Sequence, residues 1–129
     1  MTVKMRPRLV VQDAAKAIEF YGRALGATEV GQRHTVDGKI VHVELSLGDL
    51  TFSLKDADGT DDSGDRAPTT LGGTPVIFGL DTDDADAVYR RLVDAGASVV
   101  FPLADHEYGL RQGRVQDPFG HLWIVSQAI

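Results

Sequence analysis

The sequence predicts an α+β protein made of two βαβββ modules in tandem, and two observations carry this prediction. Short β-prone stretches and amphipathic helical stretches follow one another in the order β-α-β-β-β, then a polar segment, then the same order again. The halves also resemble each other, since Leu25-Gly26-Ala27 corresponds to Ala95-Gly96-Ala97 and Asp13 corresponds to Asp83. One helix covers only one face of its sheet, so we expect curved sheets around a small-molecule cavity, with the helices on the outer face.

The first module is expected to span about residues 4–56. Asp13 is a candidate N-cap, because its carboxylate can accept from the free N–H groups at the start of a helix. Apolar residues then recur at helical spacing as far as Leu25, and Gly26 ends the helix. Asp37-Gly38 is typical of a hairpin turn. The expected strands are residues 9–11, 28–34, 40–47 and 50–55.

A polar segment at about residues 57–73 is rich in Asp, Gly, Ser and Thr and predicts a surface loop that links the modules. The second module is expected over about residues 74–129, with a helix whose N-cap options are Asp81-Thr82-Asp83-Asp84 and which ends at Gly96. A turn is expected at Asp117-Pro118-Phe119-Gly120. The expected strands are residues 75–80, 98–101 (closed by Pro102), about 114–116 and 122–126.

The bulk composition limits the class of protein. With 129 residues the chain suits one compact domain, which we take as residues 1–129. The net charge of -6 and the lack of a Lys/Arg cluster argue against a nucleic-acid partner, and no apolar run is long enough to span a membrane. There is no cysteine and no hydrophobic signal core, so we expect a cytoplasmic protein without disulfides.

Strand alternation predicts a polar inner wall for the cavity. Apolar strand residues such as Val43, Leu45 and Leu54 are expected to face the helices, so their neighbours face the inner side. Three arginines and a lysine on this side favour an anionic or carbonyl-rich ligand, although the pattern also fits a solvated face or a dimer contact. The residues expected on the inner face are Arg6, Arg8, His42, Glu44, Ser46, Thr51, Ser53, Lys55 and Arg114, with Ile77, Leu122 and Ile124.

His42 and Glu44 are the candidate catalytic residues. Their spacing places both side chains on one face of a strand, with Cβ atoms about 7 Å apart. They could act as an acid–base pair next to a carbonyl group, or they could form a structural hydrogen bond. A further alternative makes them metal ligands, which requires another donor from His34, His106 or Glu107.

Four residues near the C-terminus are interpreted from their position. His121 is expected to bond to the backbone on the helix side of the last strand, and Trp123 is expected to pack in the core. Tyr108 and Arg111 fall in a polar loop before the final hairpin, where a lid over the cavity and a plain surface loop are both consistent with the sequence.

Two sets of motifs are specific in combination. The first is residues 7–14 with Ala17-Ile18-Glu19-Phe20-Tyr21 and Leu25-Gly26-Ala27, and the second is Tyr108-Gly109-Leu110-Arg111 with residues 115–123. Together they resemble the vicinal oxygen chelate superfamily, the group of glyoxalase I, the fosfomycin and bleomycin resistance proteins and the extradiol dioxygenases. The resemblance covers nearly the whole chain and implies the two-module fold and a homodimer. These are scaffold motifs, so they do not fix the function.

Metal-dependent members of that superfamily use His or Glu at matching points of four strands. The resemblance places these points at or beside Arg6, near Ser53, at Pro75 or Val76, and at Ile124. A guanidinium cannot bind a cation, and Pro, Val and Ile have no donor atom. The resemblance therefore implies a member without this metal site, and we expect neither a metal nor another cofactor.

The leading hypothesis is a metal-free small-molecule-binding protein that sequesters an antibiotic or a secondary metabolite, as the resemblance to bleomycin resistance proteins implies. One alternative is a metal-free isomerase, epimerase or lyase that uses His42 and Glu44. Another is a metal-dependent lyase or dioxygenase with relocated ligands. The candidate ligand-binding residues are Arg6, Arg8, Ser53, Tyr108, Arg111 and Arg114.

Overall fold

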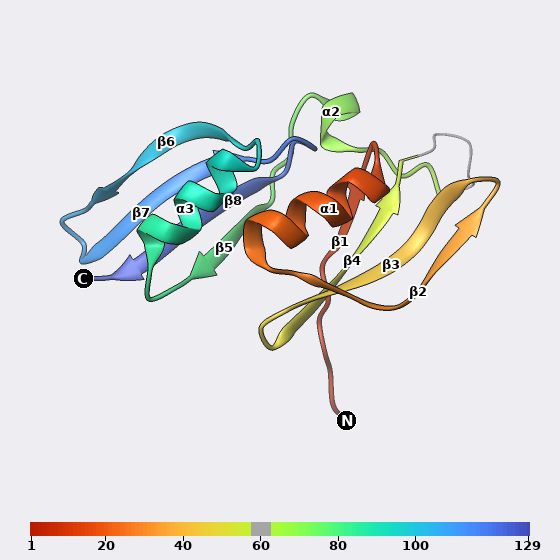
Figure 1. Ribbon diagram of the computed structural model, residues 1–129, viewed down its shortest axis with the longest axis horizontal. Helices are drawn as coiled ribbons and strands as arrows, with labels where there is room; N and C mark the ends of the chain where they lie inside the picture. The colour runs from red at the N-terminus through yellow and green to blue at the C-terminus, as the bar shows by residue number, and fades with distance from the viewer. Residues whose placement is uncertain (58–62) are drawn as a thin grey trace.

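The computed structural model describes residues 1–57 and 63–129. It consists of two four-stranded sheets, each with one long helix packed against it (Figure 1). The strand orders are β1-β4-β3-β2 and β5-β8-β7-β6, so the predicted tandem of βαβββ modules is confirmed.

The first module comprises β1 (Arg8–Val11), α1 (Ala14–Leu25), β2 (Thr28–Val36), β3 (Lys39–Leu47) and β4 (Leu50–Asp56). After the short α2 (Pro68–Leu71), the second module comprises β5 (Ile77–Asp81), α3 (Ala85–Asp94), β6 (Ser98–Asp105), β7 (Leu110–Gln116) and β8 (Leu122–Ala128).

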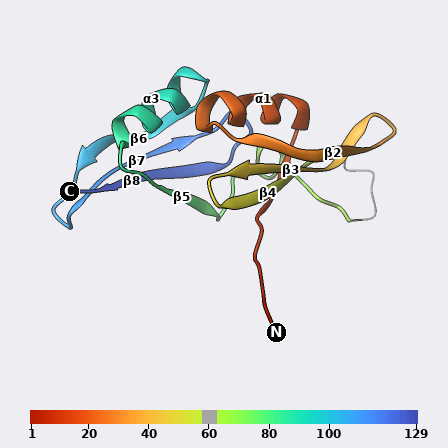
Figure 2. The same cartoon turned by 60° about the horizontal axis from the view of Figure 1, so that its bottom comes forward.

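The two long helices lie on the same side of the molecule (Figure 2). α1 and α3 contact each other, and the apolar sides of the strands pack beneath them. The outer-face position predicted for the helices is thus confirmed. The sheets lie side by side and do not close into a barrel. We call the sheet face opposite α1 or α3 the open face, because neither long helix covers it.

A buried aromatic cluster joins the modules. The ring centroids of Tyr21 on α1 and Trp123 on β8 lie 5.6 Å apart, and Trp123 also packs against Phe78 at 5.0 Å. Trp123 is 4% exposed, which confirms its predicted place in the core. His121 Nε2 lies 3.0 Å from the backbone oxygen of Val10, so the predicted backbone contact of this histidine is confirmed and links the modules.

The side chain of Asp117 is the polar centre of this join. One carboxylate oxygen accepts from the backbone N–H groups of Phe119 (2.9 Å) and His121 (3.0 Å). The other accepts from Trp123 Nε1 (2.8 Å) and from the Tyr21 hydroxyl. Burial, and then the negative charge of Asp117, raises the pKa of Tyr21 well above its usual value. The sequence predicted only a turn here, yet the turn's aspartate holds four donors from both modules.

The start of the second helix uses one of the predicted N-cap options but corrects the predicted correspondence between the modules. Asp13 caps α1 by accepting from the Lys16 backbone N–H at 3.1 Å, as predicted. The residue that caps α3 is Asp84, which accepts from the Ala87 N–H at 3.1 Å, and the correspondence of Asp13 with Asp83 is therefore wrong. The reason is local, because the hydroxyl of Thr82 accepts from the Asp84 N–H at 3.0 Å and forms a turn that delays the helix.

The prediction that Pro102 closes the strand at residues 98–101 is also wrong. β6 continues through Pro102 to Asp105. It is an edge strand with register shifts on both sides of Phe101, and an edge strand with bulges tolerates a residue that lacks an N–H donor. β7 begins at Leu110, so Arg111 lies in a strand and not in the predicted loop.

The polar linker contains a short helix that the sequence did not predict. α2 begins at Pro68, a favourable first residue because its missing N–H would be unpaired there, and it ends at Gly72, whose φ is 83°. Residues 58–62 of the predicted loop lie outside the described residues. Within the described ranges, no helix is long and apolar enough to cross a membrane.

Candidate functional site on the open faces

Polar side chains gather on the open face of the first sheet, where strand alternation predicted them. Ser53 on β4 is the register partner of both Arg8 on β1 and Glu44 on β3, so these residues form one row across the sheet. His42 lies two residues from Glu44 along β3 and shares its face. Val43, between them in sequence, is fully buried on the helix side. The pleat of β3 thus separates an apolar side from a polar side.

Two arginines connect the residues of this face. Arg6 forms an ion pair with Glu44, whose side chain is 26% exposed. Arg8 donates from Nη1 to His42 Nδ1 at 2.8 Å and from Nη2 to a backbone carbonyl of β3 at 2.6 Å. Arg8 Nη1 also lies 3.4 Å from Ser53 Oγ. The structure therefore brings together five of the predicted site residues in one group, as two hydrogen-bonded sets that meet at the His42–Glu44 contact of 3.5 Å.

The contact with Arg8 fixes the protonation pattern of His42. A guanidinium can only donate, so Nδ1 of His42 must accept and the ring proton must sit on Nε2. Nε2 lies 3.5 Å from Glu44 Oε1. Nδ1 is therefore occupied by Arg8, and Glu44 is already paired with Arg6. This geometry favours binding over acid–base chemistry.

Lys55 is on the same face but does not serve as an exposed cation. Its side chain is 6% exposed, and Nζ lies 2.9 Å from a carboxylate oxygen of Asp65 in the linker. A buried ammonium needs such a partner, because an unpaired charge away from water is costly. The linker therefore covers this end of the open face and holds its lysine in place.

The open face of the second sheet is more apolar. Arg114 on β7 has Phe101 on β6 and Ile124 on β8 as its register partners. The guanidinium carbon of Arg114 lies 4.9 Å from the centroid of the Phe101 ring, within the range of a cation–π contact. Ile77 on β5, which is 43% exposed, extends the apolar surface of this face.

Tyr108 and Arg111 end on different sides of β7. The Tyr108 hydroxyl donates to Gln112 Oε1 at 2.7 Å, so this tyrosine reaches the open face from the β6–β7 turn. Arg111 instead pairs with Asp86 of α3 (2.9 Å) and with Asp105 (3.1 Å). These hydrogen bonds, first to Asp86 and then to Asp105, raise the pKa of Arg111 above its usual value. The structure does not bring Arg111 to the other predicted ligand-binding residues.

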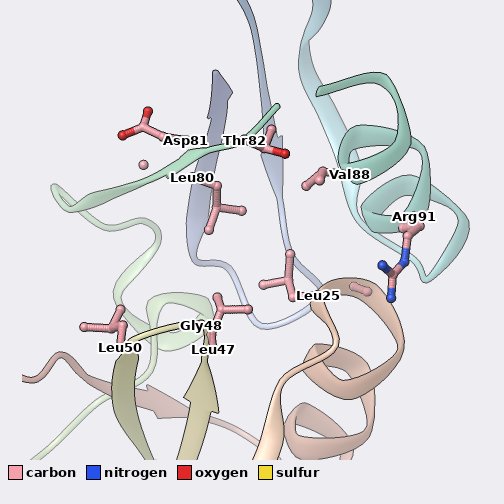
Figure 3. A pocket seen from close by; sticks show the side chains of 11 residues that line it. Leu25, Leu47, Gly48, Leu50, Leu80, Asp81, Thr82, Val88 and Arg91 are labelled. Atoms are coloured by element: carbon pink, nitrogen blue, oxygen red, sulfur yellow. The ribbon is translucent and has the colours of Figure 1, made fainter. Parts of the chain in front are cut away.

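A cavity of about 360 Å³ lies at the seam between the modules (Figure 3). Its lining is mainly apolar, with Leu25 from α1, Leu47 from β3 and Leu80 from β5, and Arg91 of α3 borders it. None of the residues predicted to bind ligand lines this cavity. Sequence reasoning missed it because it forms where separate modules meet, and strand alternation within one module carries no signal for that.

The residues that the resemblance places at metal positions do not fit a metal ion. Arg6 presents a guanidinium that already pairs with a carboxylate, Ser53 presents one hydroxyl, and Ile124 has no donor atom. Among residues 1–57 and 63–129, no three His, Cys, Asp or Glu side chains are grouped closely enough to hold a metal.

The relocated donors considered from the sequence lie in two separate places. The rings of His34 and His42 have centroids 6.0 Å apart, on neighbouring strands of the first sheet. His106 belongs to the β6–β7 turn of the second module, where its ring stacks on Tyr108 at 5.1 Å, and Glu107 is exposed in the same turn. The fold therefore keeps His34 beside His42 but places His106 and Glu107 in the other module.

Comparison with known proteins identifies the family. Residues 5–125 match the Glyoxalase/Bleomycin resistance protein/Dioxygenase superfamily, and the chain belongs to this superfamily. An uncharacterized protein of Mycobacterium bovis is 44% identical over 127 residues, which cover 97% of this chain and 83% of that protein.

Solved structures share the fold. TioX from Micromonospora sp. ML1 superimposes with a TM-score of 0.75 at 29% identity, covering 99% of this chain and all of that chain. A bleomycin-binding protein, solved in complex with bleomycin, has a TM-score of 0.65 at 24% identity and covers 99% of this chain. At that identity the second likeness establishes the fold alone.

Proposed function

We propose that this protein binds a small organic molecule on the open faces of its sheets, without a metal ion. The observation that carries the proposal is a group of polar side chains on a sheet face that no long helix covers. Hydrogen bonds, an ion pair and one 3.5 Å contact link its members, which are Arg6, Arg8, His42, Glu44 and Ser53. Side chains held in place by one another and by the backbone lose little freedom when a ligand binds. Their guanidinium groups favour an anionic or carbonyl-rich ligand.

Membership of the superfamily indicates only a broad class of ligand. The superfamily includes proteins that bind bleomycin, so an antibiotic or a secondary metabolite is the kind of molecule that we propose for sequestration. Cytoplasmic localisation remains a prediction from composition.

We infer that the working form is a homodimer. A ligand pocket encloses most of its ligand, whereas a single uncovered sheet face contacts one side only. The second open face carries exposed Ile77 and half-buried Leu122 and Ile124, an apolar surface suited to burial. A second copy could cover the polar face of one chain with this apolar face and so enclose the ligand. Sedimentation analysis at micromolar concentration should give twice the chain mass, and a monomer would exclude this arrangement.

A ligand screen by thermal unfolding tests the binding proposal. A compound present at 100 times its Kd should stabilise the folded state by about 2.7 kcal/mol. We expect Arg8→Gln to weaken the hits, because it removes the donors to His42, Ser53 and the backbone, while Arg90→Gln on the exposed surface of α3 should not. If no compound saturates below the millimolar range, the proposal fails. Stoichiometric metal in protein purified without chelator would overturn its metal-free part.

A second candidate function rests on the 3.5 Å contact between His42 Nε2 and Glu44 Oε1. It is proton transfer next to a carbonyl group, in a metal-free isomerase, epimerase or lyase. His42→Gln and Glu44→Gln should then each abolish turnover of a substrate found in the screen while binding survives. Equal turnover in both variants and the native protein would exclude this function.

A further inference from the structure

Two arginines on β7 differ in what surrounds them. Arg111 and Arg114 are the two arginines of the described residues that are not exposed. Arg111 faces the helix side and has two carboxylate partners, Asp86 and Asp105. Arg114 faces the open side and has no hydrogen-bond acceptor among the described residues, and its Nε is a buried atom without a partner. Buried polar groups are nearly always paired, so the environment of Arg114 lacks an acceptor.

The row of residues around Arg114 explains why no hydrogen-bond acceptor is present. Across the sheet this row runs from Phe101 through Arg114 and Ile124 to Gly79, and none of their side chains offers an oxygen. The Phe101 ring lies against the guanidinium and orients it. Gly79 leaves the far end of the row empty, since a Cβ built there would meet only Ile124 Cγ2, at 3.7 Å. The row is thus an apolar strip with one oriented cation.

The neighbouring rows limit the charge of a molecule that could lie here. One consists of Ile77, Leu122 and Gln116, and the other contains Asp81, Ser126 and Gln112. Arg114 is therefore the single cation in these rows, as far as the described residues go, and Asp81 adds a negative charge. A monoanion suits this balance better than a phosphate dianion.

We propose that Arg114 anchors the carboxylate of a small aromatic acid whose ring lies along Ile124 and Gly79. This inference rests on the proposed function and names the ligand class of the second open face. The two Nη groups of Arg114, which are not among the buried atoms, gain an acceptor, and a planar carboxylate matches their paired N–H donors. The apolar strip takes the ring.

Titration of 15N-labelled protein with benzoate tests the proposal, with the Nε–H signal of Arg114 as the direct readout and Arg114→Lys used to assign it. Benzamide has the same ring without the charge, and phenyl phosphate tests a dianion. We expect benzoate to shift the Arg114 signal saturably and to bind more tightly than either comparison compound. Arg114→Gln should weaken benzoate binding about ten- to hundred-fold, the range for loss of a charge-assisted contact. Arg90→Gln, on the helix side, should leave it unchanged.

Three results would overturn the proposal. Equal benzoate affinity in Arg114→Gln and the native protein would place the acid elsewhere. Saturation by other compounds of the screen but not by benzoate would refute the aromatic acid and leave the proposed function standing. If Arg114→Gln shifts the dimer towards monomer and benzoate has no effect on the Arg114 signal, the missing acceptor belongs to a second copy of the chain.

Discussion

The two modules follow one backbone plan but secure it with different side chains. In the first module, Asp56 on β4 accepts from the N–H of Ala14, the first residue of α1, at 2.7 Å. In the second, Gln127 on β8 accepts from the N–H of Ala85, the first residue of α3, at 2.8 Å. Asp56 is buried and also accepts from Ile40 at 2.7 Å, so the first anchor closes a second strand onto the helix. Both modules therefore have a hydrogen-bond acceptor at this position, although the residue type differs.

The open faces diverge much further. Three residues before each anchor lie Ser53 and Ile124, whose register partners on the next strand are Glu44 and Arg114. The same position therefore carries a carboxylate in one module and a guanidinium in the other. Both helix-facing sides must bury apolar surface to be stable, whereas an open face is not held to that requirement. The comparison teaches that the two halves differ most on their open faces, where we propose that a ligand binds.

Loss of the Asp117 side chain, the polar centre of the join between the modules, should have the largest effect on stability. Asp117→Ala leaves four buried donors unpaired, including groups from both modules, and should lower the free energy of unfolding by about 3–5 kcal/mol. Urea unfolding followed by tryptophan fluorescence measures it. Asp83→Ala, at an exposed position, should stay within about 0.5 kcal/mol of the native protein. A loss below 1 kcal/mol for Asp117→Ala would mean that the hydrogen bonds of Asp117 contribute little to joining the modules.

Loss of the two helix anchors, Asp56 and Gln127, should lower the free energy of unfolding by different amounts. Asp56→Ala removes two hydrogen bonds to a buried carboxylate and should destabilise the protein by about 2–4 kcal/mol. Gln127→Ala removes one bond to a partly buried amide and should cost about 1 kcal/mol. Hydrogen exchange of the Ala14 and Ala85 amides reports each anchor separately. Equal costs would show that the second bond of Asp56 contributes nothing.

A smaller effect is expected where the helix-facing sides differ. Val43 and Gly113 occupy equivalent places, one residue from Glu44 and Arg114. A Cβ on Gly113 would lie 2.7 Å from the Tyr89 ring and 2.8 Å from the backbone nitrogen of Leu103. Gly113→Ala should therefore cost about 1–3 kcal/mol from overpacking. Gly79→Ala, where nothing is closer than 3.7 Å, is the matched control in thermal unfolding and should be close to neutral.

The smallest effect is expected for the arginine on the helix side of β7. Hydrogen bonds from Arg111 lower the pKa of Asp86. The pair therefore stabilises the folded state fully at pH values above the pKa of that carboxyl in the unfolded chain, which is about 4. This contribution is lost as the pH falls through the lower pKa of the folded state. Arg111→Gln should lower the melting temperature slightly at pH 7, and the difference should shrink below pH 4 and in 1 M salt. A difference that persists at low pH would indicate lost packing instead of lost charge.

Local signals predicted most of the fold. The cap at Asp13, the stop at Gly26 and the turn at Asp37-Gly38 depend on residues close in sequence, and each stands where expected. The errors also have local causes that the pattern could not weigh. Pro102 is tolerated because β6 is at an edge, and strand order is a property of the whole sheet.

The candidate site was likewise predictable from the sequence only in part. By itself the sequence determined which side of β3 and β4 is polar, because successive side chains of a strand alternate between its faces. That was enough to place His42, Glu44 and Ser53 together. Only the tertiary structure decided their partners and the side of β7 that Arg111 takes. Arg8 meets His42 across 34 residues and Tyr21 meets Asp117 across 96, and no periodicity within one segment encodes contacts at such separations. They exist because the helix-facing sides pack and so fix every strand relative to the others.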